Sequence, residues 1–277
     1  MILLSIIITH YKTPELLKQC IKAIKKNIQN INCQIIVTDS QATPENQKII
    51  KNLFPGIIYL FFKKNVGFSQ LVNQGIKRAQ GKYLLIINAD TIIDEKETIK
   101  EMIKCFEKHP EIGLLGPRLL NLDGTWQQSC FRFYSLITVL CRRTFLGKLP
   151  WGKNFLNHFL MKDALDKETS KNKNPIPVDW LMGSVLFTKR TALKKVGLLD
   201  ERFFMYFEDV DWSRRFWEAG FKVVYFPKVY VYHHYLRASK KRGGILDLFS
   251  SKYTQIHLLS ALKYFLKYGL RTPSYGS

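Results

Sequence analysis

Residues 3–24 read LLSIIITHYKTPELLKQCIKAI and contain the unit whose repetition decides the fold. The run from Leu3 to Thr9 is apolar and rich in β-branched residues, which predicts a strand buried on both faces. Pro14 predicts the start of a helix, because its fixed φ suits the first helical position. The apolar residues after it recur with helical spacing: Leu16, Leu17, Cys20, Ile21 and Ile24. A buried strand followed by an amphipathic helix predicts one β-α unit of a parallel sheet.

The same alternation continues as far as about residue 120. Strands are expected at residues 34–38, 57–62, 83–87 and 113–116, and helices at 44–53, 68–79 and 95–109. This β-α-β-α order predicts an α/β fold with a mostly parallel, doubly wound sheet. Sheets of this kind bind their ligands in a crevice at the carboxyl ends of the strands.

The pattern is weaker in the second half of the chain. Residues 163–174 are polar and are expected to form a mobile loop. The expected elements after it are a strand at 178–187, a helix at 188–196 and strands at 221–226 and 229–232, with Pro227 between the last two. From Gly243 onward the apolar residues again follow a helical spacing. We therefore divide the chain into residues 1–120, residues 121–240 and a tail of basic amphipathic helices at 241–277.

The chain is strongly basic, since 43 Lys and Arg residues against 22 Asp and Glu residues give a formal net charge of +21. Such an excess indicates an anionic partner, which could be nucleic acid, a phospholipid surface or a phosphorylated substrate. In residues 131–161 and 244–271 the basic residues alternate with bulky apolar ones. This pattern is typical of helices that lie on a membrane surface. We therefore expect an anionic membrane surface as a partner, and no nucleic acid.

The five cysteines are odd in number and show no CxxC spacing, which indicates free thiols in a reducing compartment. The opening MILLSIII is too short for a signal peptide and has no charged residues before it. No window approaches the ~18 apolar residues of a membrane span. These features predict a cytoplasmic protein that is peripheral on the inner face of the cell membrane.

Residues 204–220 read FMYFEDVDWSRRFWEAG and place three carboxylates at the expected start of a helix. Glu208, Asp209 and Asp211 follow four apolar residues. A carboxylate in such a setting is a candidate general base. The alternative is that one of them only caps the helix, since acidic residues favour that position.

Polar residues also follow the expected strands of the first half. Thr9 and Tyr11 follow the first strand, Asp39 ends the second, and Asn65-Val66-Gly67-Phe68 follows the third. Asn88-Ala89-Asp90 ends the fourth. Each of these alone could be a turn. Together they predict a nucleotide site, because the carboxyl ends of parallel strands meet at one edge of the sheet.

The phosphates of such a nucleotide need a partner, yet the sequence has neither a GxGxxG fingerprint nor a phosphate-binding loop. A divalent cation on Asp90 would supply one, because hard cations prefer oxygen ligands and bridge diphosphates. His233 closes the last expected strand. It is either a second ligand of that cation or a structural residue.

The ordered set of motifs resembles the family 2 glycosyltransferases, and within them the rhamnosyltransferase-like branch. The resemblance covers about residues 3–240 and rests on LSIIITHYKTPELLKQCI, VTDS, NVGFSQLVNQGIKRAQGKYLLIINADT and the run from WLMGS to VYVYHH. It implies a GT-A fold, with a nucleotide-sugar-binding half at 1–120 and an acceptor-binding, catalytic half at 121–240. It also implies an inverting transfer from a nucleotide-sugar.

The resemblance also assigns roles to individual residues. The implied donor-binding residues are Thr9, Tyr11, Asp39, Gly67, Asn73, Asn88 and Asp90. Asp39 would read the base, and Asn88-Ala89-Asp90 falls on the family's DxD metal motif with Asn in the first place. The implied metal ligands are Asp90 and His233, and the ion is Mg²⁺ or Mn²⁺. Asp209, supported by Glu208, would be the base, and the acceptor side would hold Trp180, Gly183 and Asp211.

The predicted function is transfer of a sugar to a hydroxyl of a lipid-linked or polysaccharide acceptor in cell-surface glycan synthesis. The family makes dTDP-rhamnose the expected donor, while UDP-hexoses remain open. A nucleotidyltransferase of similar sheet order is one alternative, but it needs a Gly-rich loop where residues 9–15 read THYKTPE. A non-catalytic basic module is the other, and it would not need acidic residues at the strand ends.

Overall fold

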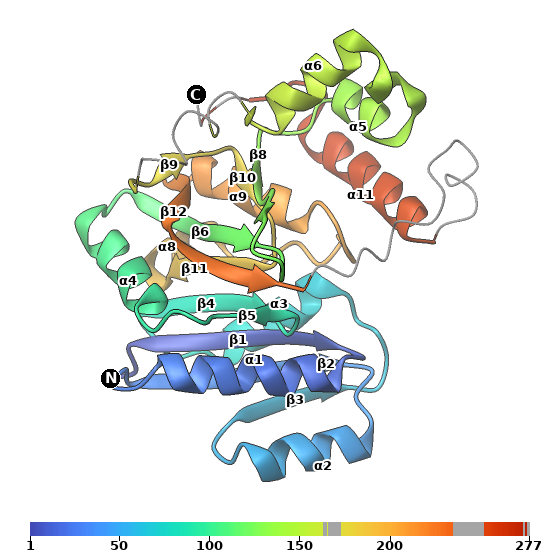
Figure 1. The fold of residues 1–277 in the computed structure, drawn as a ribbon. Helices are drawn as coiled ribbons and strands as arrows, with labels where there is room; N and C mark the ends of the chain where they lie inside the picture. Colours follow the sequence, from blue (N-terminus) through green and yellow to red (C-terminus); the bar gives the residue numbers. More distant parts are fainter. Residues whose placement is uncertain (163–164, 166–172, 235–251, 274, 276–277) are drawn as a thin grey trace.

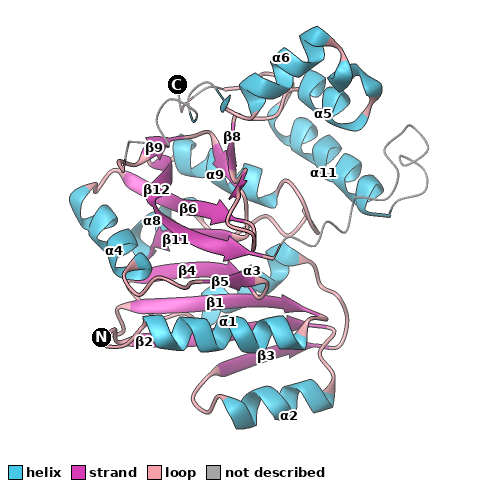
Figure 2. Ribbon diagram, viewed as in Figure 1, coloured by secondary structure: helices cyan, strands magenta, loops and turns pink. Residues whose placement is uncertain are grey.

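A mixed sheet of ten strands runs through the described part of the computed structural model, which comprises residues 1–162, 165, 173–234, 252–273 and 275 (Figures 1 and 2). Its main path is β3-β2-β1-β4-β11-β6-β12-β5. The first-half strands are β1 (Leu4–Tyr11), β2 (Cys33–Ser40), β3 (Ile58–Phe62), β4 (Tyr83–Asn88), β5 (Thr91–Ile92) and β6 (Ile112–Leu120). The helices between them are α1 (Pro14–Asn27), α2 (Pro44–Leu53), α3 (Phe68–Arg78) and α4 (Thr98–Lys108).

The second half adds both strands and helices. Its strands are β7 (Trp126–Gln127), β8 (Cys130–Phe131), β9 (Ile176–Pro177), β10 (Trp180–Leu181), β11 (Val185–Lys189) and β12 (Lys222–His233). Its helical elements are α5 (Leu136–Arg143), η1 (Phe145–Lys148), α6 (Pro150–Phe159), α8 (Arg190–Val196), α9 (Glu208–Glu218) and α11 (Lys252–Tyr268).

The strands β1 to β4 pair in parallel, as the alternating pattern predicts. Successive residues of β1 point to opposite faces, so Ile6 and Ile8 pack with α1 and α4 while Ile7 packs with α3 and α9. Both faces are therefore covered by helices, which explains why these strands are continuously apolar. The pairing also aligns Thr9 with Thr38 and with Asn88, so the polar strand ends lie at one edge.

The second half differs from the prediction in two places. The expected strand at 178–187 is two strands: β10 pairs with β8 in a separate small sheet, and β11 enters the main sheet antiparallel to β4 and β6. The two strands expected around Pro227 are one strand, β12. The register between β12 and β6 shifts between Phe226 and Tyr230. Pro227 therefore lies in an irregular part of the strand, where its missing N–H does not remove a hydrogen bond of the ladder.

A third apolar cluster lies outside the sheet and is mainly aromatic. It joins α5, α6, α9 and α11 and includes Phe131, Tyr134, Phe159, Trp180, Phe207 and Tyr264. Figure 1 shows α5, α6 and α11 grouped at the end of the molecule remote from α2. Of the expected C-terminal helices, α11 is described, whereas residues 243–251 and most of the expected loop at 163–174 lie outside the described residues. Among the described helices, none has the length and apolar character needed to cross a membrane.

Candidate active site

Two adjoining cavities lie at the carboxyl ends of β1 and β4. The larger, of about 610 Å³, is lined by Thr9, Tyr11 and Gly67, among others. The smaller, of about 340 Å³, is lined by residues that include Gly183, Glu208, Asp209 and His233. Both cavities share Phe68, Asn88, Asp90, Met205 and Tyr206. The structure thus brings Thr9, Asn88, Asp90, Glu208 and Asp209 to one composite site.

The larger cavity depends on a tight approach at Gly67. Its φ of +82° lies in the left-handed region, and a Cβ there would be 2.4 Å from the carbonyl oxygen of Phe204. The next residue, Phe68, donates its backbone N–H to the same oxygen at 2.9 Å. Thr9 Oγ1 donates to Asn88 Oδ1 at 2.8 Å, which fixes the amide at the boundary of the two cavities. Only glycine lets the start of α3 lie this close to the 204–207 loop.

Asp39 lies beneath the larger cavity and does not line it. Its carboxylate is buried, with Oδ1 2.7 Å from His10 Nδ1 and Oδ2 accepting a hydrogen bond from the Tyr59 hydroxyl. Burial and the contact with Asp39 raise the pKa of Tyr59. The neighbouring Ser40 and Gln41 line the cavity instead. In this arrangement Asp39 orients His10, which is itself part of the cavity wall.

Asn73, which was predicted to bind the donor, lies in the wall of neither cavity. Its side chain is buried, donates to the carbonyl of Leu199 and to Glu201 Oε1 at 2.9 Å each, and accepts from the Leu199 N–H at 2.9 Å. These three bonds engage both the nitrogen and the oxygen of the amide. Asn73 therefore ties α3 to the segment that precedes the carboxylates and has a structural role.

Asp90 and His233 form a pair at the boundary of the cavities. His233 Nε2 lies 3.4 Å from Asp90 Oδ1, and that oxygen is buried without a hydrogen-bond partner among the described residues. The backbone N–H of His234 donates to the carbonyl of Asp90 at 2.7 Å and fixes the loop. An imidazole nitrogen and an orphaned carboxylate oxygen fit a divalent cation. The described residues hold no cluster of three or more His, Cys, Asp or Glu side chains.

Asp209 stands in the first turn of α9 and lines the smaller cavity. Its Oδ2 accepts the backbone N–H of Gly183 at 3.0 Å, and its Oδ1 accepts that of Val210 at 2.9 Å. Burial raises the pKa of Asp209 to about 6, against the effect of these hydrogen bonds. Asp209 is therefore ionised at neutral pH and only weakly stabilised in that form, which suits a general base.

Glu208 differs from its neighbour although both line the same cavity. Its side chain is buried, and Oε2 has no hydrogen-bond partner among the described residues. Burial and the adjacent charge of Asp209 raise the pKa of Glu208 well above its usual range. Burial and the neighbouring charge therefore both disfavour the ionised form of Glu208, whereas the hydrogen bonds to Asp209 favour its ionised form.

The backbone before the two carboxylates is strained. Tyr206 and Phe207 have φ of 69° and 67°, a region that costs a non-glycine residue about 1–3 kcal/mol. Aromatic packing stabilises this conformation. The centroid of the buried Phe207 ring lies 4.6 Å from that of Tyr134 and 5.2 Å from that of His257. His257 comes from α11 and lines the smaller cavity, although the sequence offers no reason to single it out.

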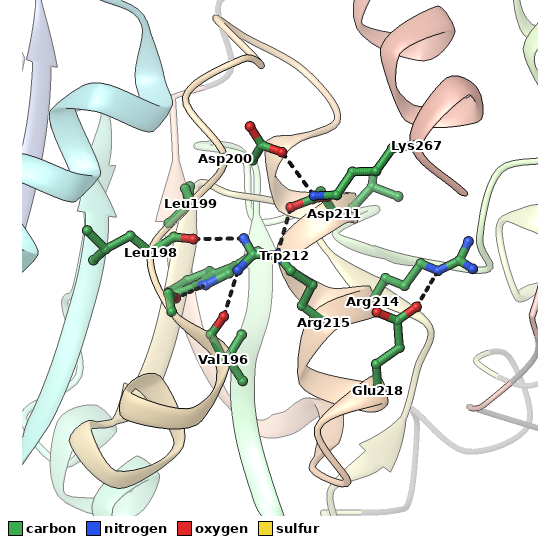
Figure 3. Close-up of polar contacts among 12 residues, drawn as sticks. Val196, Leu198, Leu199, Asp200, Asp211, Trp212, Arg214, Arg215, Glu218 and Lys267 are labelled. Atoms are coloured by element: carbon green, nitrogen blue, oxygen red, sulfur yellow. Dashed lines mark hydrogen bonds and ion pairs between the residues drawn. The ribbon is translucent and has the colours of Figure 1, made fainter. Parts of the chain in front are cut away.

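Asp211, which was predicted for the acceptor side, also lies in the wall of neither cavity. Its side chain is fully buried, with Oδ2 2.9 Å from Arg215 Nε and Oδ1 accepting from Tyr268 at 2.9 Å and from Lys267. Lys267 Nζ also donates a hydrogen bond to Asp200 Oδ2 at 2.9 Å. Figure 3 shows Lys267 reaching from α11 to both carboxylates. Asp211 thus anchors α11 to α9 and lines neither cavity.

Trp180 and Gly183, predicted for the acceptor side, both line the smaller cavity. The Trp180 ring stacks on Phe131 at 4.3 Å between centroids, and its Nε1 donates to the carbonyl of Arg132 at 2.8 Å. Tyr134 lies beside the stack, under the guanidinium of Arg142. Part of the wall of the smaller cavity is therefore an aromatic surface with the cation Arg142 beside it. The sequence marks Arg142 only as one of the basic residues in the segment 131–161.

The fold is of the GT-A type. Among solved structures, the mannosyltransferase PcManGT from Pyrobaculum calidifontis, in complex with GDP-Man and Mn²⁺, is similar with a TM-score of 0.58 at 17% identity. The match covers 98% of this chain and 65% of that one. GalNAc-T7, with UDP, GalNAc and Mn²⁺, has a TM-score of 0.61 at 15% identity, covering 84% of this chain and 43% of that one.

The chain belongs to glycosyl transferase family 2, whose family model matches residues 5–165. A second model, described as Glycosyltransferase (GlcNAc), matches residues 94–261. The predicted family, fold class and enzyme class are thereby confirmed, and the nucleotidyltransferase and non-catalytic alternatives fall away.

The curated relatives include two rhamnosyltransferases. The N-acetylglucosaminyl-diphospho-decaprenol L-rhamnosyltransferase of Mycobacterium tuberculosis is 28% identical over 211 residues, which are 72% of this chain and 66% of that protein. Rhamnosyltransferase WbbL of Escherichia coli K12 is 24% identical over 254 residues, 87% of either chain. The low-salt glycan biosynthesis hexosyltransferase Agl10 of Haloferax volcanii is 26% identical. The match covers 61% of Agl10, so this chain spans less than two thirds of the length of Agl10 and of the M. tuberculosis protein.

Proposed function

We propose that the protein transfers a sugar from a nucleoside diphosphate in the larger cavity to an acceptor hydroxyl in the smaller one, with inversion at the anomeric carbon. The observation that carries the proposal is the shared boundary of the two cavities. Asn88 and Asp90 line both, and Asp209 lines the smaller one beside them. A donor and an acceptor bound in adjoining cavities are held in reacting distance of one another.

The proposed reaction is a direct displacement. Asp209 takes the proton of the acceptor hydroxyl while that oxygen forms a bond to the anomeric carbon. The bond from this carbon to the diphosphate breaks, and its electron pair leaves with the nucleoside diphosphate. Because burial and the charge of Asp209 raise the pKa of Glu208, we assign the role of the base to Asp209 alone. An inverting transfer by direct displacement requires one carboxylate base and no nucleophilic carboxylate.

Asp90 and His233 are the proposed ligands of a Mg²⁺ or Mn²⁺ ion, which would offset the negative charge of the departing diphosphate. The two similar structures whose names include Mn²⁺ support a divalent metal in this fold. Asn88 stands where the DxD motif has its first carboxylate, and its amide oxygen accepts a hydrogen bond from Thr9. We propose that Asn88 orients the donor.

We propose dTDP-rhamnose as the donor, because two relatives are named as rhamnosyltransferases. A thermal-shift panel of dTDP-rhamnose, UDP-glucose, UDP-N-acetylglucosamine and GDP-mannose, each with and without Mn²⁺, tests the base, the sugar and the metal together. Stabilisation by dTDP-rhamnose that increases with Mn²⁺ is the expected result. Release of dTDP only when an acceptor is added then tests transfer itself, and absence of any nucleotide-sugar binding would refute the proposal.

We propose a lipid-linked sugar as the acceptor. The name of the M. tuberculosis relative contains a diphospho-decaprenol group. In this chain the aromatic wall of Phe131, Tyr134 and Trp180 offers a stacking surface for a sugar ring. Arg142 at its edge offers a cation to a diphosphate.

The face built by α5, η1, α6 and α11 is the proposed contact with an anionic membrane, and we call it the basic apolar face. Its elements contain no acidic residue, and they carry Arg142, Lys148, Lys153, Lys252, Lys263 and Lys267. More than half of the exposed large apolar side chains among the described residues lie here or directly beside it: Leu136, Ile137, Leu140, Phe145, Leu149, Trp151, Phe155, Tyr253, Leu259, Leu262, Leu266 and Leu270. Exposed apolar groups among cations suit a surface of anionic lipid.

Co-sedimentation with vesicles tests this face. The double variant Leu262→Gln/Leu266→Gln should bind more weakly to vesicles that contain phosphatidylglycerol. The double variant Leu53→Gln/Leu122→Gln changes two exposed leucines outside this face and should leave binding unchanged. Equal binding of both double variants would refute the membrane contact and leave the proposed transfer untouched.

A further inference from the structure

We infer that Gln127 is a positioning residue for the proposed metal site: its side chain orients the ring of His233 so that Nε2 is presented to Asp90. The inference rests on the proposed function in one respect, since it takes Asp90 and His233 as the ligands of a divalent cation. Neither the motifs of the sequence nor the comparisons assign a role to Gln127.

The sheet itself brings Gln127 and His233 together. β7 pairs antiparallel with β6, which places Gln127 opposite Leu119. β12 pairs in parallel with the other edge of β6, which places Tyr232 opposite Leu120. Gln127 and His233 therefore lie on the two sides of the end of β6, although 106 residues separate them in the chain. Both side chains are buried, so their geometry is set by packing.

The hydrogen bond between the two side chains fixes the tautomer of His233. Gln127 Oε1 lies 2.9 Å from His233 Nδ1. An amide oxygen can only accept, so Nδ1 carries the hydrogen, and in a neutral imidazole Nε2 then carries the lone pair. This is the nitrogen that lies 3.4 Å from Asp90 Oδ1.

Two acceptor atoms facing each other at this distance repel unless a proton or a cation lies between them. Asp90 Oδ1 is buried and has no hydrogen-bond partner among the described residues. A divalent cation coordinated by Nε2 and Oδ1 would satisfy both atoms. Hydrogen bonds of this kind to the second nitrogen of a ligating histidine orient the ring and raise its basicity, and their loss weakens metal binding by about 10- to 100-fold.

Manganese binding measures the effect directly. Mn²⁺ is titrated into the full chain with UDP or dTDP present, and the signal of free aqueous Mn²⁺ is followed by electron paramagnetic resonance. Gln127→Leu keeps the side-chain size but removes the acceptor, so its dissociation constant should rise about 10- to 100-fold. Gln127→Glu keeps an acceptor at the same place and should bind Mn²⁺ at least as tightly as the wild type.

Two controls separate this role from a merely structural one. Gln47→Leu makes the same replacement on α2, away from both cavities, and should not change the affinity for Mn²⁺. The thermal midpoint without metal, measured for every variant, reports the fold independently of the metal.

The inference is overturned if Gln127→Leu binds Mn²⁺ as the wild type does, or if Gln127→Glu loses as much affinity as Gln127→Leu. It is also overturned if the wild type depletes no free Mn²⁺ at all. The titration contains no sugar and involves no transfer. A failure of the proposed function, such as absence of transfer to any acceptor, therefore appears in a different experiment and is distinguishable from a failure here.

Discussion

The backbone N–H of Gly183 donates to Oδ2 of Asp209 across 3.0 Å, and this bond joins the segment between β10 and β11 to the first turn of α9. It holds the carboxylate at the wall of the smaller cavity. It also stabilises the ionised form of Asp209, while burial acts in the opposite direction. The balance leaves a carboxylate that is charged at neutral pH and poorly solvated, and this state is the basis of the first two predictions.

Asp209→Asn should reduce the turnover number by about 10²- to 10⁴-fold, because an amide cannot take the proton of the acceptor hydroxyl. Binding of the nucleotide-sugar should be nearly unchanged, since Asp209 lines the smaller cavity and not the larger. Turnover is measured by release of the nucleoside diphosphate, and binding by calorimetry. Asp123→Asn, in an exposed turn, is the control. Wild-type turnover in Asp209→Asn would place the base elsewhere.

The pH dependence of kcat/KM should show an acidic limb governed by Asp209, whose pKa is about 6. The base must be deprotonated, so kcat/KM should be constant above this pH and should fall tenfold per pH unit below it. The profile is measured between pH 5 and 8, with circular dichroism showing that the protein stays folded. A profile that is flat down to pH 5 would contradict the assignment.

Glu208→Gln should stabilise the protein at pH 8. The pKa of Glu208 is raised in the folded state, so its contribution to stability is present at low pH and is lost as the pH rises through the folded pKa. An amide has no charge to bury, and each kcal/mol regained should raise the melting temperature by about 2–4 °C. The difference should vanish near pH 4. Glu45→Gln, on the exposed first turn of α2, should show no such effect, and a lower melting temperature of Glu208→Gln at pH 8 would count against a neutral Glu208.

Gly67→Ala should destabilise the protein and weaken nucleotide binding, because the new Cβ would lie 2.4 Å from the Phe204 carbonyl at a positive φ. Gly56→Ala is a matched control, since Gly56 also has a positive φ, of +88°, but has nothing within 4 Å of an added Cβ. The backbone cost alone is about 1–2 kcal/mol, and the control should show only this. Chemical denaturation and nucleotide titration measure both quantities. Equal losses in the two variants would show that the close approach at Phe204 is unimportant.

Lys267→Met should cost about 2–4 kcal/mol of unfolding free energy, because it removes a cation from the fully buried Asp211. Arg215 and Tyr268 remain as partners of Asp211. On the same helix, Lys263 bonds only the exposed carbonyl of Arg202, at 2.8 Å, so Lys263→Met should cost less than about 1 kcal/mol. Urea denaturation compares the two. A similar cost for both would mean that α11 is held by its apolar contacts and not by the Asp211 network.

Much of the first half was predictable, because its structure follows from local patterns. The continuous apolar strands and the amphipathic helices specify a parallel sheet, and a parallel sheet brings Thr9, Asn88 and Asp90 to one edge whatever the details of packing. The second half was less predictable. β11 runs antiparallel between β4 and β6, and Pro227 lies within a strand, because pairing with distant partners decided both.

The predicted site residues divide in the same way. Asn73 and Asp211 matched positions in a motif, yet their side chains bond Leu199 and Lys267 and lie outside both cavities. Gln127, Arg142 and His257 line or support the site without any motif. Gln127 contacts His233, which is 106 residues away in the chain, and His257 contacts Phe207 from another helix. A one-dimensional pattern does not record such contacts.

The sequence by itself determined the class of fold, the family and the chemical types at the strand ends, because these depend on the order of strands, helices and polar turns. Only the tertiary structure decided which carboxylate is ionised, which residues line a cavity and which cation partners a buried acid. These properties depend on burial and on distances between remote side chains, and Asp209 and Asp211 illustrate them. The two lie two residues apart on one helix, and one lines the cavity while the other is buried against α11.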